Sequence, residues 1–138
     1  MNKYAAKLLF QFRVSVEGKS FKRRMCEERI VLIEARTAKQ ALLKANRSGV
    51  KSQFDYRNSD GNPVNFEFVG VMDLLELGVE CEPGTVWYNI THRLLPLERK
   101  RKIIPPESKL NAIAWESRAV RRRPTDRVVR LGPVVRRL

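Results

Sequence analysis

Hydrophobic and polar residues alternate along the first segment of the chain, from about Tyr4 to Val16. Leu8, Phe10 and Phe12 fall on one side of this alternation, and Gln11 falls on the other. A period of two over this length predicts a half-buried strand.

The next hydrophobic stretch, from about Phe21 to Ala35, predicts a second strand. A turn at Gly18 would pair it antiparallel with the first strand. Its centre, Ile30 to Ile33, is apolar at every position. A strand with one solvated face alternates, so this run favours an interior strand that is covered on both faces.

After Ala35 the hydrophobic period changes from two to about 3.6, which predicts a helix. Thr37 and Gln40 have the spacing of a capping box at its start. Gly49 is placed to end the helix in a left-handed cap. The passage contains no nucleophile, base or phosphate-binding glycines, so we interpret it as scaffold. The predicted apolar side of the helix consists of Ala38, Ala41, Leu42 and Ala45.

Three more strands are predicted after the helix. Alternation around Phe54 and from Val64 onward flanks an Asp60-Gly61 turn, which is typical of a hairpin. The last strand is predicted from about Thr85 to Leu95. The order ββαβββ indicates the α+β class: a mainly antiparallel sheet of about five strands with one helix packed on a face.

Charge divides the 138-residue chain near Pro96. Residues 1–95 contain 15 Lys and Arg against 11 Asp and Glu, whereas residues 96–138 contain 13 against four. The latter segment therefore holds nine of the 13 net positive charges. We predict an α+β domain over residues 1–95 and a basic C-terminal arm over residues 96–138. A short helix is predicted within the arm, from about Glu107 to Arg123.

The chain contains few features that indicate a membrane or a metal. No stretch approaches the roughly 20 apolar residues of a membrane span, and the N-terminal segment does not resemble a signal peptide. We therefore expect a cytoplasmic protein. Cys26, Cys81 and the single histidine, His92, are too few for the four ligands of a structural zinc site. We expect two reduced thiols, no metal and no cofactor.

Four stretches within residues 1–95 resemble a known family. They are KYAAKLLFQF, CEERIVLIEARTAKQALLKA, FVGVMDLLEL and TVWYNI. Through these stretches, residues 3–95 resemble a family of small bacterial proteins catalogued as domain of unknown function 4288. The resemblance brings no catalytic residues to this chain. The basic arm from Pro96 onward lies outside it.

No pattern of residues indicates an enzyme. Glu27 and Glu28 are adjacent, so in a strand they point to opposite faces and cannot act as a carboxylate pair. His92 is linked to no Ser or Cys by a recognisable motif. A phosphate-binding loop, a dinucleotide fingerprint and an H-E-x-x-H motif are all absent from the sequence. We expect a non-enzymatic protein without catalytic residues.

Aromatic residues at alternate strand positions leave two interpretations open. Aromatic side chains on an open sheet can stack bases, as in RNA-recognition modules. Alternatively, they pack under the helix, and we favour this because an alanine-rich helix needs bulky partners. The residues concerned are Phe10, Phe12, Phe54, Tyr56, Phe66 and Phe68.

The basic arm is the strongest indication of function. Arginine and lysine bind phosphate oxygens, and each phosphate they neutralise releases counterions. Trp115, in the predicted helix, is costly to leave in water and favours a partner-binding element. The candidate polyanion-binding residues are Arg99, Lys100, Arg101, Lys102, Arg121, Arg122, Arg123, Arg127, Arg130, Arg136 and Arg137.

Our leading hypothesis is a non-enzymatic binding protein whose arm engages RNA or DNA with low sequence specificity. The alternative is a protein–protein interaction module, of the immunity or regulatory kind. It would use the sheet face and the Trp115 helix to bind an acidic protein partner. A third interpretation has the arm solvated or folded back on the acidic residues of segment 73–82. Membrane-surface binding ranks last, because the predicted helix is poor in large apolar residues.

Overall fold

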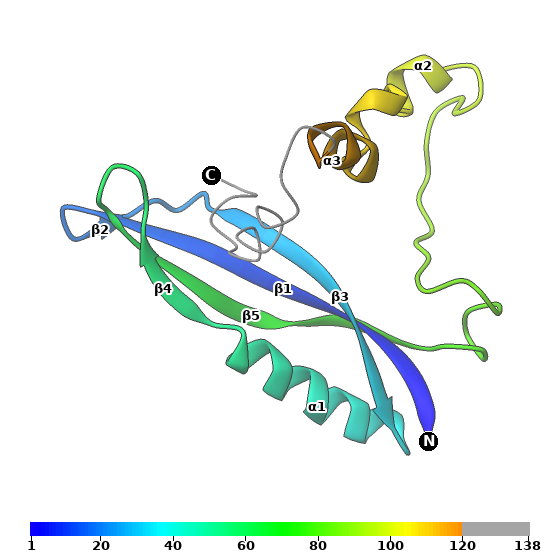
Figure 1. Cartoon of the computed structure of the whole chain (residues 1–138). Coiled ribbons are helices and arrows are strands. Elements are labelled where there is room, and N and C mark those ends of the chain that lie inside the picture. The colour runs from blue at the N-terminus through cyan, green and yellow to red at the C-terminus, as the bar shows by residue number, and fades with distance from the viewer. Residues whose placement is uncertain (120–138) are drawn as a thin grey trace. The chain divides into compact units, whose positions relative to one another are not determined.

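The computed structural model describes residues 1–119. By its contacts the chain divides into one unit, Met1–Asn89, and a second that begins at Ile90, and each is described by itself. The first unit is an antiparallel sheet with a helix on it, which confirms the predicted α+β class (Figure 1). Its elements are β1 (Asn2–Val16), β2 (Lys19–Ser20), β3 (Met25–Ala35), α1 (Ala38–Lys51), β4 (Phe54–Arg57) and β5 (Pro63–Glu76).

The long strand β1 is the centre of the sheet. β3 pairs with β1 on one side, from Asn2 opposite Ala35 to Phe12 opposite Met25. β5 pairs with it on the other side, and β4 pairs with the outer edge of β5. Figure 1 shows β1 between β3 and β5, with α1 along one face of the sheet. The period-two pattern of β1 thus decides which side chains of its neighbours face the helix.

The face of the sheet toward α1 is built on an aromatic cluster. The ring of Phe66 stacks on Phe10 with centroids 4.7 Å apart, and it contacts Phe12 at 4.8 Å and Phe54 at 5.0 Å. Phe10, Phe12 and Phe66 are at most 2% exposed. Side chains so enclosed cannot stack a base, so the structure supports the packing interpretation of these aromatics.

The start of α1 agrees with the predicted capping box. The Gln40 amide donates to Thr37 Oγ1 at 3.2 Å, and Gln40 Oε1 accepts from the Arg36 amide at 3.3 Å. These bonds satisfy backbone donors that have no partner within the helix. They require only residues four or fewer positions apart, so the sequence was sufficient to predict them.

The end of α1 does not agree with the prediction. The helix continues through Gly49 to Lys51, and the amide of Ser52 donates to the last carbonyls. Gly49 is therefore not a left-handed cap. It is a buried residue within the helix, and the ring of Phe68 lies against it. The buried side of the helix also differs from the prediction: it consists of Ala41, Ala45 and Gly49, whereas Ala38 and Leu42 are exposed.

Strand β5 contains two bulges opposite β1. Leu9 faces Gly70 and Phe10 faces Phe68, so Val69 is an extra residue. A second register shift leaves Met72 as an extra residue in the same way. An inserted residue reverses the alternation, so the bulges keep Phe68 and Leu74 on the helix side of the sheet. The first of these bulges lies next to Gly70.

The prediction that the second strand is an interior strand is wrong. Among the described residues, β3 pairs with β1 alone and is an edge of the sheet. Leu32 is 67% exposed and Ile30 is 44% exposed on the face away from α1. The strand also starts later than predicted. It begins at Met25, and Phe21, the predicted start, lies exposed in the loop before it. A continuous apolar run therefore did not mean cover on both faces.

The predicted strand from Thr85 to Leu95 is also absent. Residues 85–93 have no regular structure, and the fifth strand is instead the two-residue β2. A strand this short has no period that a sequence can display. The described elements follow the order βββαββ instead of ββαβββ. The alternating apolar residues of this segment, Val86, Tyr88 and Ile90, are exposed.

The second unit has short helices where it is described. They are α2 (Lys100–Ile103), the single 3₁₀ turn η1 (Glu107–Lys109) and α3 (Asn111–Ala119). The helix predicted from Glu107 to Arg123 thus includes η1 and α3, and its last residues lie outside the described part of the chain. Within residues 1–119, no helix combines the length and apolarity needed to cross a membrane.

Candidate polyanion-binding surface

The segment after Pro96 concentrates cations on one short helix. The Arg99 amide donates to the Leu95 carbonyl in a turn, and the Ile104 amide donates to the Lys100 carbonyl across α2, which ends ahead of the Pro105-Pro106 pair. Consecutive residues of a helix project about 100° apart, so the four cations surround the turn. All are exposed, and none pairs with an acidic residue among residues 1–119. These cations are Arg99, Lys100, Arg101 and Lys102.

Trp115 lies in the middle of α3 and is half-buried. Ile113 and Ala114 beside it are also half-buried, whereas Leu110 is 45% exposed. An exposed tryptophan would have been the stronger indication of a partner contact. The role of Trp115 in binding a partner stays a prediction.

The remaining arm residues fall beyond the described part of the chain. They are Arg121, Arg122, Arg123, Arg127, Arg130, Arg136 and Arg137. Their assignment to polyanion binding stays a prediction from the sequence.

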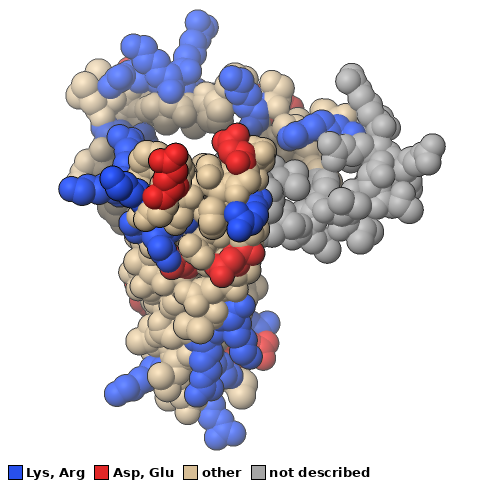
Figure 2. Space-filling view, turned by 90° about the vertical axis from the view of Figure 1, so that its left-hand side faces the viewer, with Lys and Arg blue, Asp and Glu red and all other residues tan. Residues whose placement is uncertain are grey.

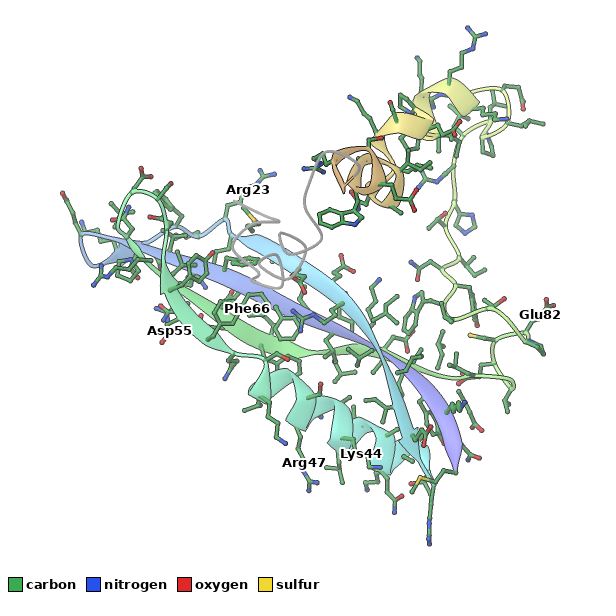
Figure 3. The ribbon with its side chains drawn as sticks, viewed as in Figure 1. Arg23, Lys44, Arg47, Asp55, Phe66 and Glu82 are labelled. Carbon is green, nitrogen blue, oxygen red and sulfur yellow. The ribbon has the colours of Figure 1, made fainter. Side chains whose placement is uncertain are left out.

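The structure adds a basic surface that the sequence interpretation assigned to scaffold. Lys44, Arg47 and Lys51 are exposed on α1 and line a shallow groove of about 440 Å³ with Ser48 and Ser52. Arg47 projects away from the sheet (Figure 3), whereas the Lys44 ammonium reaches back to the Glu34 carbonyl at the end of β3. A column of Lys and Arg side chains stands at the lower end of the view in Figure 2, the level at which α1 lies. We call Lys44, Arg47 and Lys51 the α1 basic face.

The charge of the first unit is uneven. Residues 1–89 contain 14 Lys and Arg against 11 Asp and Glu, an excess of three. Four of these cations, including the α1 basic face, are on α1, which has no acidic residue. The rest of the unit holds ten cations against 11 acids. The net positive charge of the first unit therefore comes entirely from the cations of α1.

Three cations of the sheet differ from those on α1 because each is paired. Lys7 Nζ lies 2.9 Å from Glu28 on the face away from α1. On the same face, Arg13 binds both carboxylate oxygens of Glu67 at 2.8 Å. A paired cation offers less charge to a ligand.

The Arg13–Glu67 pair has a clear electrostatic consequence. The hydrogen bond from Arg13 is the main cause that lowers the pKa of Glu67 from 4.5 to about 2, and a bond from Gln11 acts in the same direction. Arg24 extends this network, because its guanidinium donates to Gln11 Oε1 at 3.1 Å. The network joins β1, β5 and the loop before β3, so we interpret it as structural.

The third pair lies on the α1 side of the sheet. The Arg29 guanidinium binds Glu27 at 2.7 Å and lies over the ring of Phe10, 4.6 Å from its centroid. Glu27 is 5% exposed. Glu27 and Glu28 thus face opposite sides of the sheet, as their adjacency predicted. The two carboxylates do not form a catalytic pair.

The remaining candidate groups among residues 1–119 are metal ligands, the two thiols and His92. The described residues include no group of three or more His, Cys, Asp or Glu that is placed to hold a metal ion. Cys26 is an exposed free thiol and Cys81 a buried one. His92 is exposed in the second unit. The exposed cations of α1 and α2 are the arrangement with the clearest chemical use, which is to bind an anion.

Comparison with known proteins gave one match. A family model described as Domain of unknown function (DUF4288) matches residues 3–85. No curated protein and no solved structure matches the chain. The matched range includes β1 to β5 and α1, and it ends before α2.

Proposed function

The chain belongs to the family described as Domain of unknown function (DUF4288), whose description names no activity, and we therefore propose a function from its own residues. The protein is a non-enzymatic, cytoplasmic binding protein. Its basic arm, residues 96–138, engages the phosphate backbone of RNA or DNA with low sequence specificity.

The observation that carries this proposal is the state of four consecutive cations, of which three lie in α2 and one is its N-cap residue. Arg99, Lys100, Arg101 and Lys102 are exposed and have no acidic partner within residues 1–119. Unpaired cations on one turn give a high local charge without a shaped pocket. Such a surface suits a repeating backbone of phosphates better than one particular base.

Low specificity follows from the same residues. Direct readout needs side chains that are held rigidly against base edges in a groove. The cations of α2 are long, exposed side chains, and no side-chain hydrogen bond within residues 1–119 holds them. Binding therefore depends on charge and falls steeply with salt.

The test compares two variants of the full chain that lose the same charge. One replaces Arg99, Lys100, Arg101 and Lys102 by Gln. The control replaces Lys3, Lys19, Lys22 and Arg23, which are exposed in the first unit, by Gln. Anisotropy of a labelled RNA is followed from about 50 to about 200 mM salt. We expect the arm variant alone to lose affinity and about one unit of salt slope for each phosphate contact removed. Equal affinities in the two variants would refute the proposal.

A second candidate function is supported by the exposed apolar residues of β3. Leu32 and Ile30 lie side by side with Ala5 and Lys7 of β1 on the face away from α1. An exposed edge strand with such residues suits a protein partner. This protein-interaction hypothesis would require a single partner that remains bound after nuclease and high salt. The partner must be released by Leu32→Ser; retention in that variant would exclude this surface.

A further inference from the structure

We infer that the α1 basic face is a second phosphate-binding surface, located on the folded unit itself and acting on the same nucleic-acid backbone as the arm. This inference rests on the proposed function, and it assigns that function to residues outside the arm. The ligand class is a phosphodiester chain, which the three cations contact without reading its bases.

The spacing of the three cations places them in one row. Residues 44, 47 and 51 are separated by three and four positions, so they lie on the same side of a helix. With a rise of about 1.5 Å per residue, the row extends about 10 Å along α1. Successive phosphates of a duplex strand advance about 3.4 Å along the axis, so the row is long enough to follow several of them.

The surroundings leave this positive charge uncompensated. Arg47 and Lys51 have no ion-pair partner among residues 1–119, and the Lys44 ammonium donates to the carbonyl of Glu34 at 2.6 Å, not to its carboxylate. A hydrogen bond to a carbonyl fixes the Lys44 side chain and keeps its full charge. Two of its three N–H groups remain available for a phosphate oxygen.

The groove between the cations also provides a polar floor. The Ser52 hydroxyl donates to the Ser48 carbonyl at 2.9 Å, whereas within residues 1–119 the Ser48 hydroxyl donates to no acceptor. Ser48 is half-buried and lines the same groove as Arg47 and Lys51. Its O–H can bond a phosphate oxygen that the cations bring close.

The helix dipole opposes an anion at this place, but weakly. The C-terminal end of a helix has about half a negative charge, and its effect falls off within the last turn. Lys51 lies in that turn and offsets it. Against this half charge stand the three full positive charges of the row, so attraction dominates.

The composition of α1 favours a nucleic acid over a membrane surface. An interfacial helix inserts a wide apolar face into the lipid. The apolar face of α1 is already used against the sheet, through Ala41, Ala45 and Gly49. Leu43 and Val50 are the large apolar residues of α1 that are more than half exposed, and two such side chains supply little insertion energy.

The experiment uses the full chain and two triple variants that each lose three positive charges. The first is Lys44→Gln, Arg47→Gln and Lys51→Gln; Gln is a good helix former, so α1 is retained. The control is Lys19→Gln, Lys22→Gln and Arg23→Gln. Its residues are exposed, have no ion pair within residues 1–119, and Arg23 lies apart from Lys44 and Arg47 in Figure 3.

Binding of a short fluorescein-labelled duplex DNA, and of single-stranded RNA of the same length, is measured across a salt series. We expect the α1 variant to bind at least about tenfold more weakly than the native chain and to lose about two to three units of salt slope. The control variant should change affinity less than about twofold. Circular dichroism melts check folding. Arg47→Gln alone, which removes no ion pair or side-chain hydrogen bond within residues 1–119, should lower the slope by about one.

The outcomes separate this inference from the proposed function. If the folded α1 variant binds like the control, while the four-residue arm variant loses affinity, the α1 inference is wrong and the proposed function stands. If only the α1 variant loses affinity, the arm proposal is wrong and the α1 inference stands. If the native chain binds neither probe, or binds only anionic phosphatidylserine vesicles, both are wrong.

Discussion

The ring of Phe68, on β5, packs directly against the backbone of Gly49, in the last part of α1. A Cβ atom added at Gly49 would overlap Cε1 of Phe68, because it would lie closer than side chains approach one another in real structures. Phe68 is in turn held by Phe10, with ring centroids 5.5 Å apart. The absence of a side chain at Gly49 therefore determines how closely the helix approaches the sheet.

Replacing Gly49 by Ala should destabilise the protein. Alanine favours a helix by about 1 kcal/mol over glycine. Forcing a methyl group into a filled site costs about 1 to 3 kcal/mol, and here the clash is severe. We expect a net loss of roughly 1 to 2 kcal/mol in the free energy of unfolding, measured in urea. Gly70→Ala is the control, because a Cβ there meets no atom within 4 Å. Restored stability in Gly49→Ala with Phe68→Leu would identify the ring as the cause.

Replacing Arg29 should lower the free energy of unfolding more than replacing an ordinary surface arginine. Its guanidinium pairs with Glu27, which is 5% exposed, and covers the ring of Phe10. Loss of one partner of a buried pair leaves a charge with poor solvation and costs about 3 kcal/mol. We expect Arg29→Ala to lower the urea midpoint markedly. Arg29→Lys should fall between it and the native chain, because lysine keeps the charge but not the planar fork. A native-like midpoint for Arg29→Ala would contradict this role.

The Arg13–Glu67 pair predicts a pH dependence of stability. Its hydrogen bonds lower the pKa of Glu67 from 4.5 to about 2, so the native state favours the ionised carboxylate. This stabilisation is complete above the ordinary value of 4.5 and is lost as the pH falls toward 2. We expect the free energy of unfolding, measured from about pH 6 downward, to fall less steeply in Glu67→Gln than in the native chain. The same slope in both would show that the pair contributes nothing.

For that measurement, Glu34→Gln is a suitable control. Its carboxylate is exposed on β3 and makes no ion pair within residues 1–119. It should retain the native slope.

Limited trypsin digestion should cleave the chain first near α2. Arg99 to Lys102 are exposed on a single helical turn, whereas the core cluster extends from Tyr4 to Phe66. Exposed, weakly packed backbone is the preferred site of proteolysis. We expect a resistant fragment that ends close to Arg99, detected by mass spectrometry, and slower cleavage when RNA is present. RNA that leaves the cleavage rate unchanged would count against binding by α2.

Local patterns in the sequence were sufficient for much of the first unit. The alternation of β1, the Thr37–Gln40 cap and the hairpin around Gly61 depend on residues that are close along the chain. Their hydrogen bonds and faces follow from spacing alone. The charge difference between residues 1–95 and 96–138 is likewise a property of composition. The family match over residues 3–85 agrees with the resemblance found in the sequence.

Tertiary structure alone decided where the strands lie in the sheet and which cations are unpaired. β3 is an edge, and Ile30 and Leu32 are exposed on the face away from α1; no local pattern shows which strand is an edge or which face is covered. Gly49 lies within the helix, where the ring of Phe68, on β5, fills the space that a side chain would need. Arg13 is paired by a glutamate 54 positions away, whereas the α1 basic face has no such partner within residues 1–119. Helix and strand periods act over a few residues, but pairing and burial depend on distant segments that only the folded chain brings together.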